Sequence, residues 1–259
     1  MTSPKLTLSL GGLIAGILAG FLGIGGGTVL VPLMVSLGYT PVQSVATSSL
    51  AILITSISGS IQNWRMGYLD SKRVVYLGLP ALITAQFGVY LANQLTPYLL
   101  LAAFAFLLLI NIYLVELRKR LTQRSSGQIN NINPAIARIF TGGAAGILAG
   151  LFGVGGGVIM VPLQILLLGE PIKVSIQTSL GVIVLTAISA CVGHALSNNI
   201  LFTEGIILGI GGLVGVQVST RILPRLPDYI VSIIFRTMLG ILSIYVFWQA
   251  RQSYAELTP

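Results

Sequence analysis

Residues 16–33 read GILAGFLGIGGGTVLVPL, and residues 146–163 read GILAGLFGVGGGVIMVPL. The two stretches are identical at 12 of 18 positions and lie 130 residues apart (146 minus 16), which is half the length of the 259-residue chain. The match continues at the same shift, with TSSL at 47–50 aligned with QTSL at 177–180. This pattern predicts a duplicated unit of about 130 residues. It also argues against a cleaved leader at the N-terminus, because a leader has no reason to recur.

The composition is that of a membrane protein. Hydrophobic residues make up 54% of the chain, charged residues 8%, and the mean hydropathy is +0.94, which excludes a soluble domain of ordinary composition. No charged residue occurs between Lys5 and Arg65 or between Arg73 and Glu116. Such stretches fit lipid, where roughly 20 apolar residues cross the hydrocarbon core. The net charge of +8 is then explained by Lys and Arg in cytoplasmic loops, and we do not interpret it as a sign of nucleic-acid binding.

Each half of the chain contains four apolar stretches. The opening stretch of each half is too long for one span, at roughly 45 Å as a straight helix, and is interrupted by GIGGG or GVGGG. We therefore expect an all-α polytopic membrane protein of about eight transmembrane helices in two homologous four-helix halves, with the first helix of each half broken at GxGGG. The stretches run over residues 6–37, 44–62, 74–92, 98–115, 139–168, 174–196, 205–222 and 229–249.

The charged segments predict how the chain is divided. We expect a first membrane repeat at 1–116, a basic cytoplasmic linker at 117–138 and a second membrane repeat at 139–259. A second cationic loop, at 65–73, lies on the same side as the linker because two spans separate them. If each broken stretch crosses the membrane once, the repeats are parallel, and if it turns back, they are inverted. The distribution of Lys and Arg hardly distinguishes parallel from inverted repeats. Lys5, directly before the first apolar run, favours the parallel arrangement.

The glycine breaks are the first candidate site. Three consecutive glycines weaken a helix by about 1 kcal/mol each and expose backbone groups that lipid cannot satisfy. Half-helices that restart at Thr28 and Val158 would direct N–H groups and positive dipole ends into the membrane interior, where a small anion is the preferred occupant. Gly12 and its neighbours at helical spacing are assigned to helix packing, so Gly12→Ala should be mild.

At these residues the chain resembles a known family. The repeated G-x-x-x-G-x-x-G-x-G-G-G-x-x-x-x-P, followed by a TSL-type segment in each half, is similar to the TauE/SafE family of sulfite exporters, also called the 4-toluenesulfonate uptake permease family. The resemblance implies a multi-pass transporter of a bacterial or archaeal inner membrane. It implies a substrate such as sulfite, sulfoacetate or another organosulfonate, moved by export or uptake. A homodimer is compatible with it.

Polar side chains at matched positions extend the candidate site. Buried hydroxyls and amides can hydrogen-bond oxyanion oxygens without carrying a full charge. The alternative is interhelical bonding or back-bonding to the i−4 carbonyl. Gln86 aligns with Gln217 after one inserted residue. The predicted substrate-binding residues are Gly25, Gly26, Gly27, Thr47, Ser48, Ser49, Gly155, Gly156, Gly157, Thr178, Ser179, Gln86 and Gln217.

Two ionisable side chains are candidates for coupling or gating. His194, the only histidine, aligns with Trp64 at the shift of 130; it is interpreted either as a proton-coupling group or as an interfacial residue near Asn198 and Asn199. Arg236 lies inside the last apolar stretch at a cost of roughly 2.5–3.5 kcal/mol if central. It either attracts the anion or holds a gate, or it snorkels to the nearer surface.

Other classes of function fit less well. An intramembrane serine protease could use Ser58 and His194, but the motif fails at Ser56, where GxSG needs Gly. Cys191, the single cysteine, allows no intrachain disulfide and no CxxC metal site. We expect no metal and no cofactor. We predict a secondary transporter and exporter that works by alternating access, not an enzyme. The alternatives are a passive anion channel and a non-transporting membrane subunit or assembly factor.

Overall fold

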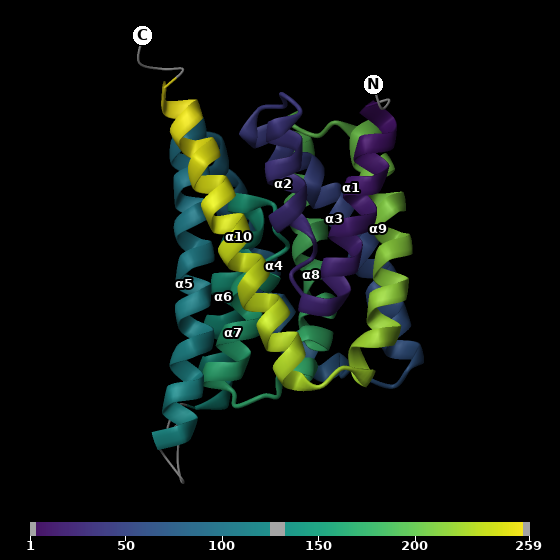
Figure 1. The fold of residues 1–259 in the computed structure, drawn as a ribbon, viewed down its shortest axis with the longest axis vertical. Helices are drawn as coiled ribbons and strands as arrows, with labels where there is room; N and C mark the ends of the chain where they lie inside the picture. The colour runs from purple at the N-terminus through teal and green to yellow at the C-terminus, as the bar shows by residue number, and fades with distance from the viewer. Residues whose placement is uncertain (1–3, 125–132, 256–259) are drawn as a thin grey trace.

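The computed structural model describes residues 4–124 and 133–255, and these ranges are helical throughout apart from short connections (Figure 1). Seven of the described helices are long and apolar enough to span a membrane. The predicted all-α polytopic fold is thereby confirmed. The helices are α1 (Pro4–Leu22), α2 (Gly27–Ser36), α3 (Pro41–Arg65), α4 (Ser71–Gln94), α5 (Pro97–Arg124), α6 (Pro134–Phe152), α7 (Gly157–Leu167), α8 (Ile172–Leu196), α9 (Phe202–Ile222), the 3-10 turn η1 (Leu223–Arg225) and α10 (Asp228–Ala255).

Local sequence signals start several of these helices. Thr40 and Gln43 form a reciprocal capping box at α3, and the Asp70 carboxylate accepts hydrogen bonds from the first N–H groups of α4. Asn133 caps α6 in the same way, with Pro134 in the first turn. Such caps satisfy N–H groups that have no partner inside the helix.

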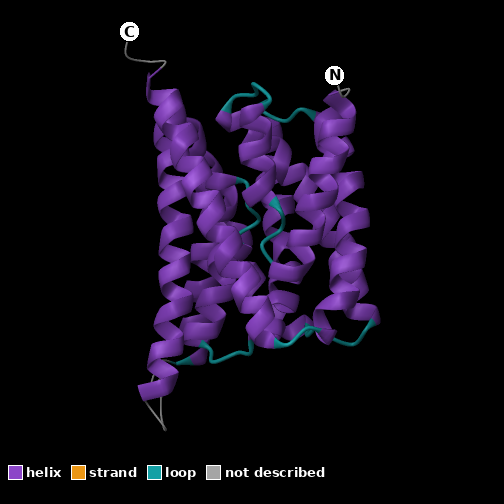
Figure 2. Ribbon diagram, in the orientation of Figure 1, coloured by secondary structure: helices purple, strands orange, loops and turns teal. Residues whose placement is uncertain are grey.

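The opening stretch of each half breaks where three glycines follow one another, as predicted. Gly25 and Gly26 have φ of 76° and 85°, and Gly155 and Gly156 have φ of 76° and 78°. Other side chains rarely adopt this left-handed region. Figure 2 shows the breaks as two loop segments inside the helical bundle. Each opening stretch therefore forms two helices, and this is why the described residues contain ten α-helices instead of about eight.

After each break the chain turns back along the helix that it has just left. A Cβ at Gly26 would lie 2.9 Å from the carbonyl oxygen of Ala15, and one at Gly11 would meet the side chain of Leu33. These contacts show that α2 runs antiparallel to α1. A Cβ at Gly156 would likewise meet Ala145, so α7 turns back along α6.

The two halves run in opposite directions. Helix α9 is parallel to α3, since Gly205 lies against Leu50 and Gly209 against Ile54. A five-residue connection, 66–70, joins α3 to α4, which runs back antiparallel to α3 (Figure 1). Consequently α9 runs antiparallel to α4, although the two helices occupy equivalent positions in their halves. The expectation of parallel repeats was wrong, because the return of α2 and α7 gives each half an odd number of crossings.

The positive charges identify the two faces. Figure 1 places the N-terminus and the C-terminal end of α10 at one face, and the end of α5 and the start of α6 at the other. The second face carries Arg73, paired with Glu170 at 2.8 Å, and Lys173, paired with Asp228 at 3.3 Å. By the positive-inside rule it is the cytoplasmic face. Of the 14 Lys and Arg residues, 11 belong to its loops and flanking turns: Arg65, Lys72, Arg73, Arg118, Lys119, Arg120, Arg124, Arg138, Lys173, Arg221 and Arg225.

Packing joins the halves more closely than it joins neighbours in the sequence. The most extensive helix contacts are those of α1 with α9 and of α4 with α6. A Cβ at Gly12 would meet the backbone carbonyl of Leu208, and one at Gly16 the backbone of Gly212. The expectation that Gly12→Ala is mild was therefore wrong, since the added carbon meets backbone and not a flexible side chain. The repeat boundaries at 116 and 139 stay a prediction.

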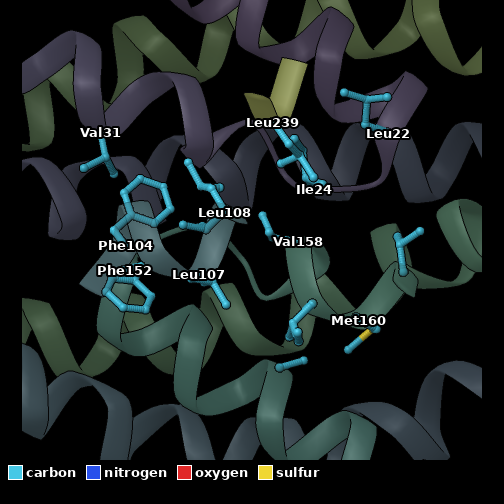
Figure 3. Close-up of a cluster of buried hydrophobic side chains, with 14 of the residues drawn as sticks. Leu22, Ile24, Val31, Phe104, Leu107, Leu108, Phe152, Val158, Met160 and Leu239 are labelled. Atoms are coloured by element: carbon cyan, nitrogen blue, oxygen red, sulfur yellow. The ribbon is translucent and has the colours of Figure 1, made fainter. Parts of the chain in front are cut away.

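A hydrophobic cluster surrounds the breaks (Figure 3). Ile24 and Val154 within the breaks are buried in it, and Phe104 stacks on Phe152 with ring centroids 5.4 Å apart. The cluster excludes water from the centre of the bundle, so each backbone polar group there needs a protein partner or a bound ligand.

Candidate functional site: the crossed helix breaks

The two breaks lie against each other at the centre of the molecule. A Cβ at Gly25 would lie 3.1 Å from the carbonyl oxygen of Val154. A Cβ at Gly27 would lie 2.7 Å from Cα of Val154, and one at Gly157 would lie 2.8 Å from Cα of Ile24. Segments 23–27 and 153–157 thus cross antiparallel and are buried throughout. The structure brings together the six glycines predicted from the sequence.

Hydroxyl groups from the opposite half satisfy carbonyl groups of the breaks. Ser48 donates to the carbonyl oxygen of Gly153 at 2.8 Å, and Ser179 donates to that of Gly23 at 2.7 Å. Each serine also contacts a carbonyl of its own helix. In this state both hydroxyl protons are engaged by backbone, so the pair holds the crossing together.

This pairing corrects the sequence register. Ser48 and Ser179 are equivalent at a shift of 131 (179 minus 48), whereas the alignment of TSSL with QTSL paired Ser48 with Thr178. The extra residue lies in the α7–α8 region, because α6 and α7 follow α1 and α2 at a shift of 130, while α8 follows α3 at 131 (172 minus 41).

The half-helices α2 and α7 begin at the crossing, and their N-terminal turns face it. Gly26 and Gly156 occupy the N-cap positions, where neither supplies a side-chain hydrogen bond. The positive ends of both helix dipoles are therefore directed into the crossing. Thr28, in the first turn of α2, is fully buried, and its hydroxyl has no hydrogen-bond partner among the residues that the structure describes. Val158 holds the equivalent position in α7.

The remaining predicted hydroxyls lie along α3 and α8. Thr47 accepts a hydrogen bond from the N–H of Leu201 at 3.1 Å, and Ser49 donates to the carbonyl of Val45 in its own helix at 3.0 Å. Thr178 is 1% exposed. Whether any of them binds substrate stays a prediction.

The paired amides join helices and do not lie in the crossing. Gln86 in α4 donates to the hydroxyl of Ser189 in α8 at 2.9 Å, and Gln217 in α9 donates to that of Ser58 in α3 at 2.8 Å. Both pairs follow the shift of 131. This repeated bond fastens α4 to α8 and α9 to α3.

The two coupling candidates lie apart. The ring of His194 is fully buried, with Nε2 3.1 Å from the carbonyl oxygen of Gly150, and the residue lies in the last turn of α8, close to Asn199. Its equivalent at a shift of 131 is the buried Asn63 and not Trp64. Arg236 is half-buried in the cytoplasmic half of α10, and Ala105 holds the equivalent position in α5. The coupling or gating roles stay predictions.

Three side chains that the sequence did not single out also border the crossing. Ile52 and Ile183 fill the space beside Gly25 and Gly155, with Cγ2 of Ile52 3.1 Å from the Cβ position of each glycine. Thr186 donates to the carbonyl oxygen of Gly155 at 3.0 Å. An alignment of the two halves at a shift of 131 pairs Ile52 with Ile183, and no other sequence signal could have indicated these side chains.

Comparison with known proteins identifies the family. The family model described as sulfite exporter TauE/SafE matches residues 8–246. The chain belongs to this family. It is 25% identical to the probable membrane transporter protein YunE of Bacillus subtilis, over 92% of this chain and 95% of that protein. It is 28% identical to a probable membrane transporter protein of Methanocaldococcus jannaschii, over 89% of this chain and 82% of that one.

A shorter match reaches a plant member of the family. Sulfite exporter TauE/SafE family protein 1 of Arabidopsis thaliana is 30% identical over 35% of this chain and 20% of its own length. No solved structure matches the chain. The bacterial and archaeal relatives, together with the seven candidate spans, place the chain among multi-pass proteins of the bacterial or archaeal plasma membrane.

Membership in this family and the geometry both oppose the serine-protease alternative. Ser58 lies near the cytoplasmic end of α3, where it accepts the hydrogen bond of Gln217. His194 lies near the opposite end of the bundle, in the last turn of α8. A nucleophile and its base must be within hydrogen-bonding reach, which this pair is not.

Proposed function

We propose that the chain is a secondary transporter, and an exporter, of small sulfur-containing oxyanions such as sulfite, sulfoacetate or other organosulfonates. The name of the family and the names of the relatives support transport and this substrate class. The proposed binding site is the crossing of the two breaks, with Gly25–Gly27 and Gly155–Gly157 as its walls.

The observation that carries the proposal is the meeting of two uncapped half-helix ends in a buried, apolar centre. Each end directs N–H groups inward, and a helix N-terminus favours negative charge. The unpartnered hydroxyl of Thr28 adds one donor at the same place. Neutral donors of this kind bind an oxyanion without a buried cation, which would be costly when the site is empty.

The inverted halves supply a mechanism of alternating access. Helix α2 connects the crossing to the extracytoplasmic face, and α7 connects it to the cytoplasmic face. The bonds from Ser48 to Gly153 and from Ser179 to Gly23 tie each break to the opposite half, so a shift of one half moves both breaks. In this structure Ile52 and Ile183 lie beside Gly25 and Gly155, in the space that the anion would occupy. Substrate therefore stabilises a state in which these side chains have moved aside.

Transport in proteoliposomes tests the proposal. Purified protein is reconstituted, and flux of labelled sulfite, thiosulfate and sulfonates is measured with and without a pH gradient. A coupled carrier accumulates one of these anions when the gradient is imposed. Flux that only equalises the concentrations would identify a passive channel, and no flux above protein-free liposomes would identify a non-transporting subunit.

A further inference from the structure

A cavity of about 750 Å³ opens at the extracytoplasmic end of α2. Its walls come from the end of α2, the connection to α3, the start of α5 and the last turns of α10. Helix α2 has its other end at the crossing, so the cavity and the proposed site lie at the two ends of one half-helix. The lining residues are Val35, Ser36, Gly38, Tyr39, Thr40, Pro41, Pro97, Tyr245, Trp248, Gln249, Gln252 and Ser253.

The lining is largely apolar and aromatic with several polar groups, and none of the described residues in it is Lys, Arg, Asp or Glu. It combines hydroxyl, amide and indole donors with the rings of Tyr39, Tyr245 and Trp248. The rings of Tyr245 and Trp248 lie 6.0 Å apart and are tilted by 34°. Neutral donors can hold an oxyanion, and aromatic faces suit an apolar group. The volume falls in the range of roughly 300–1,000 Å³ typical of sites for organic ligands.

One lining residue connects the cavity to α2. Gln249 is 4% exposed, and its amide nitrogen donates to the carbonyl oxygen of Pro32 at 2.8 Å. Its amide oxygen is buried and has no hydrogen-bond partner within residues 4–124 and 133–255. Pro32 lacks an N–H group, so α2 forgoes one of its internal hydrogen bonds at this point. A ligand that draws Gln249 toward the cavity would therefore loosen α2 where the helix is already weak.

We infer that this cavity is a second, outer site on the transport route, and that it binds an organic oxyanion, a carboxylate or sulfonate that carries an apolar group. The inference rests on the proposed function, since the route begins at the crossing. Donors without full charge hold such an anion weakly enough for release to the outside. The volume and the aromatic rings favour an organic anion over bare sulfite.

The two tryptophans of the chain make a direct binding test possible. Trp248 lines the cavity, and Trp64 lies at the cytoplasmic face with 66% exposure, so Trp64→Phe leaves Trp248 as the only indole reporter. The Trp64→Phe protein in nanodiscs is titrated with benzoate, neutral benzamide and sulfite. We expect a saturable change in Trp248 fluorescence with benzoate, and a much smaller one with benzamide or sulfite.

A pair of conservative variants locates the signal. Tyr39→Phe removes one lining hydroxyl and should weaken benzoate binding about fivefold, the usual loss for one hydrogen bond. Tyr90→Phe, in the extracytoplasmic half of α4 and 59% exposed, should leave it unchanged. No saturable response to benzoate, or equal binding by wild type and Tyr39→Phe, would overturn the outer site.

Two other outcomes would overturn the ligand class. Equal responses to benzoate and benzamide would show that the cavity does not recognise the oxyanion. A response to sulfite as strong as that to benzoate would show that the cavity does not recognise the apolar group. The binding test is independent of flux. Binding at Trp248 without transport in proteoliposomes would contradict the proposed function, whereas transport without binding would contradict only the outer site.

Discussion

The two broken segments are nearly identical in sequence, yet one enters the bundle from outside and the other from the cytoplasm. Both have left-handed glycines at the same places, and both receive a serine hydroxyl from the opposite half. They differ just after the break, where α2 has Thr28 and α7 has Val158. Matched residues thus build the crossing. Under the proposed alternating access, the unmatched residues are where the outward-facing and inward-facing states would differ in affinity.

The largest effect is expected from filling the breaks. Gly26→Val and Gly156→Val each place a β-branched side chain at φ near +80°, against the backbone of Ala15 or Ala145. Both variants should insert into the membrane but lose anion binding and transport completely. The readout is labelled-anion binding by detergent-purified protein. Unchanged binding with normal expression would return the breaks to a packing role.

The opposite directions of the halves predict an all-or-none difference in labelling. In a Cys191→Ala background, a cysteine at Ser253 should react with a membrane-impermeant thiol reagent in intact cells. A cysteine at Ser126, which lies outside the described residues, should be protected until the cells are opened. Protection of both positions would restore the parallel arrangement.

Arg236 is a difference between the two halves, because Ala105 holds the equivalent position in the first half. If its charge draws the anion from the cytoplasm, Arg236→Gln should lose most of the transport and Arg236→Lys should retain part of it. Expression and chromatographic behaviour serve as the control for folding. Equal transport by Gln and wild type would show that the guanidinium only snorkels.

Thr28→Val makes the two half-helix ends alike. Removing a buried hydroxyl without a protein partner should leave the melting temperature unchanged or higher. If the hydroxyl donates to the anion, affinity should fall by about 1–3 kcal/mol. Val158→Thr is the matched control, and it should lower stability without raising affinity. Wild-type affinity in Thr28→Val would remove this residue from the site.

The smallest effect on anion affinity is expected from the serines that tie the breaks together, because backbone carbonyl groups engage their hydroxyls and the loss falls on stability. Ser48→Ala and Ser179→Ala each leave a buried carbonyl without its donor from the opposite half and should each lower the free energy of unfolding by about 1–3 kcal/mol. Because the bonds are equivalent, the two losses should be equal within error in urea unfolding. A loss for one serine alone would show that the halves are not matched at the crossing.

Those features of the fold that depend on residues close together in the chain could be predicted from the sequence. Three consecutive glycines break a helix wherever they occur in a span, so the break at Gly25–Gly27 was predictable. The direction of the next helix was not, since it depends on the packing of α2 along α1. The sequence showed one inserted residue before Gln217 but not its position, because Thr178 and Ser179 both resemble Ser48. Keeping the shift of 130 beyond that position misaligned His194 with Trp64. The acceptor of Ser48 is a carbonyl 105 residues away, which no local pattern indicates.

The pairing of α1 with α9 has a consequence for biosynthesis. Pro4 precedes Phe202 by 198 residues (202 minus 4), so at roughly 5–20 residues per second the ribosome needs roughly 10–40 s to supply the partner of the first span. Throughout that interval the glycine-rich surface of α1 faces lipid or an insertion factor. The first repeat therefore enters the bilayer as an incomplete intermediate, and it is vulnerable to membrane proteases until the last quarter of the chain has been translated.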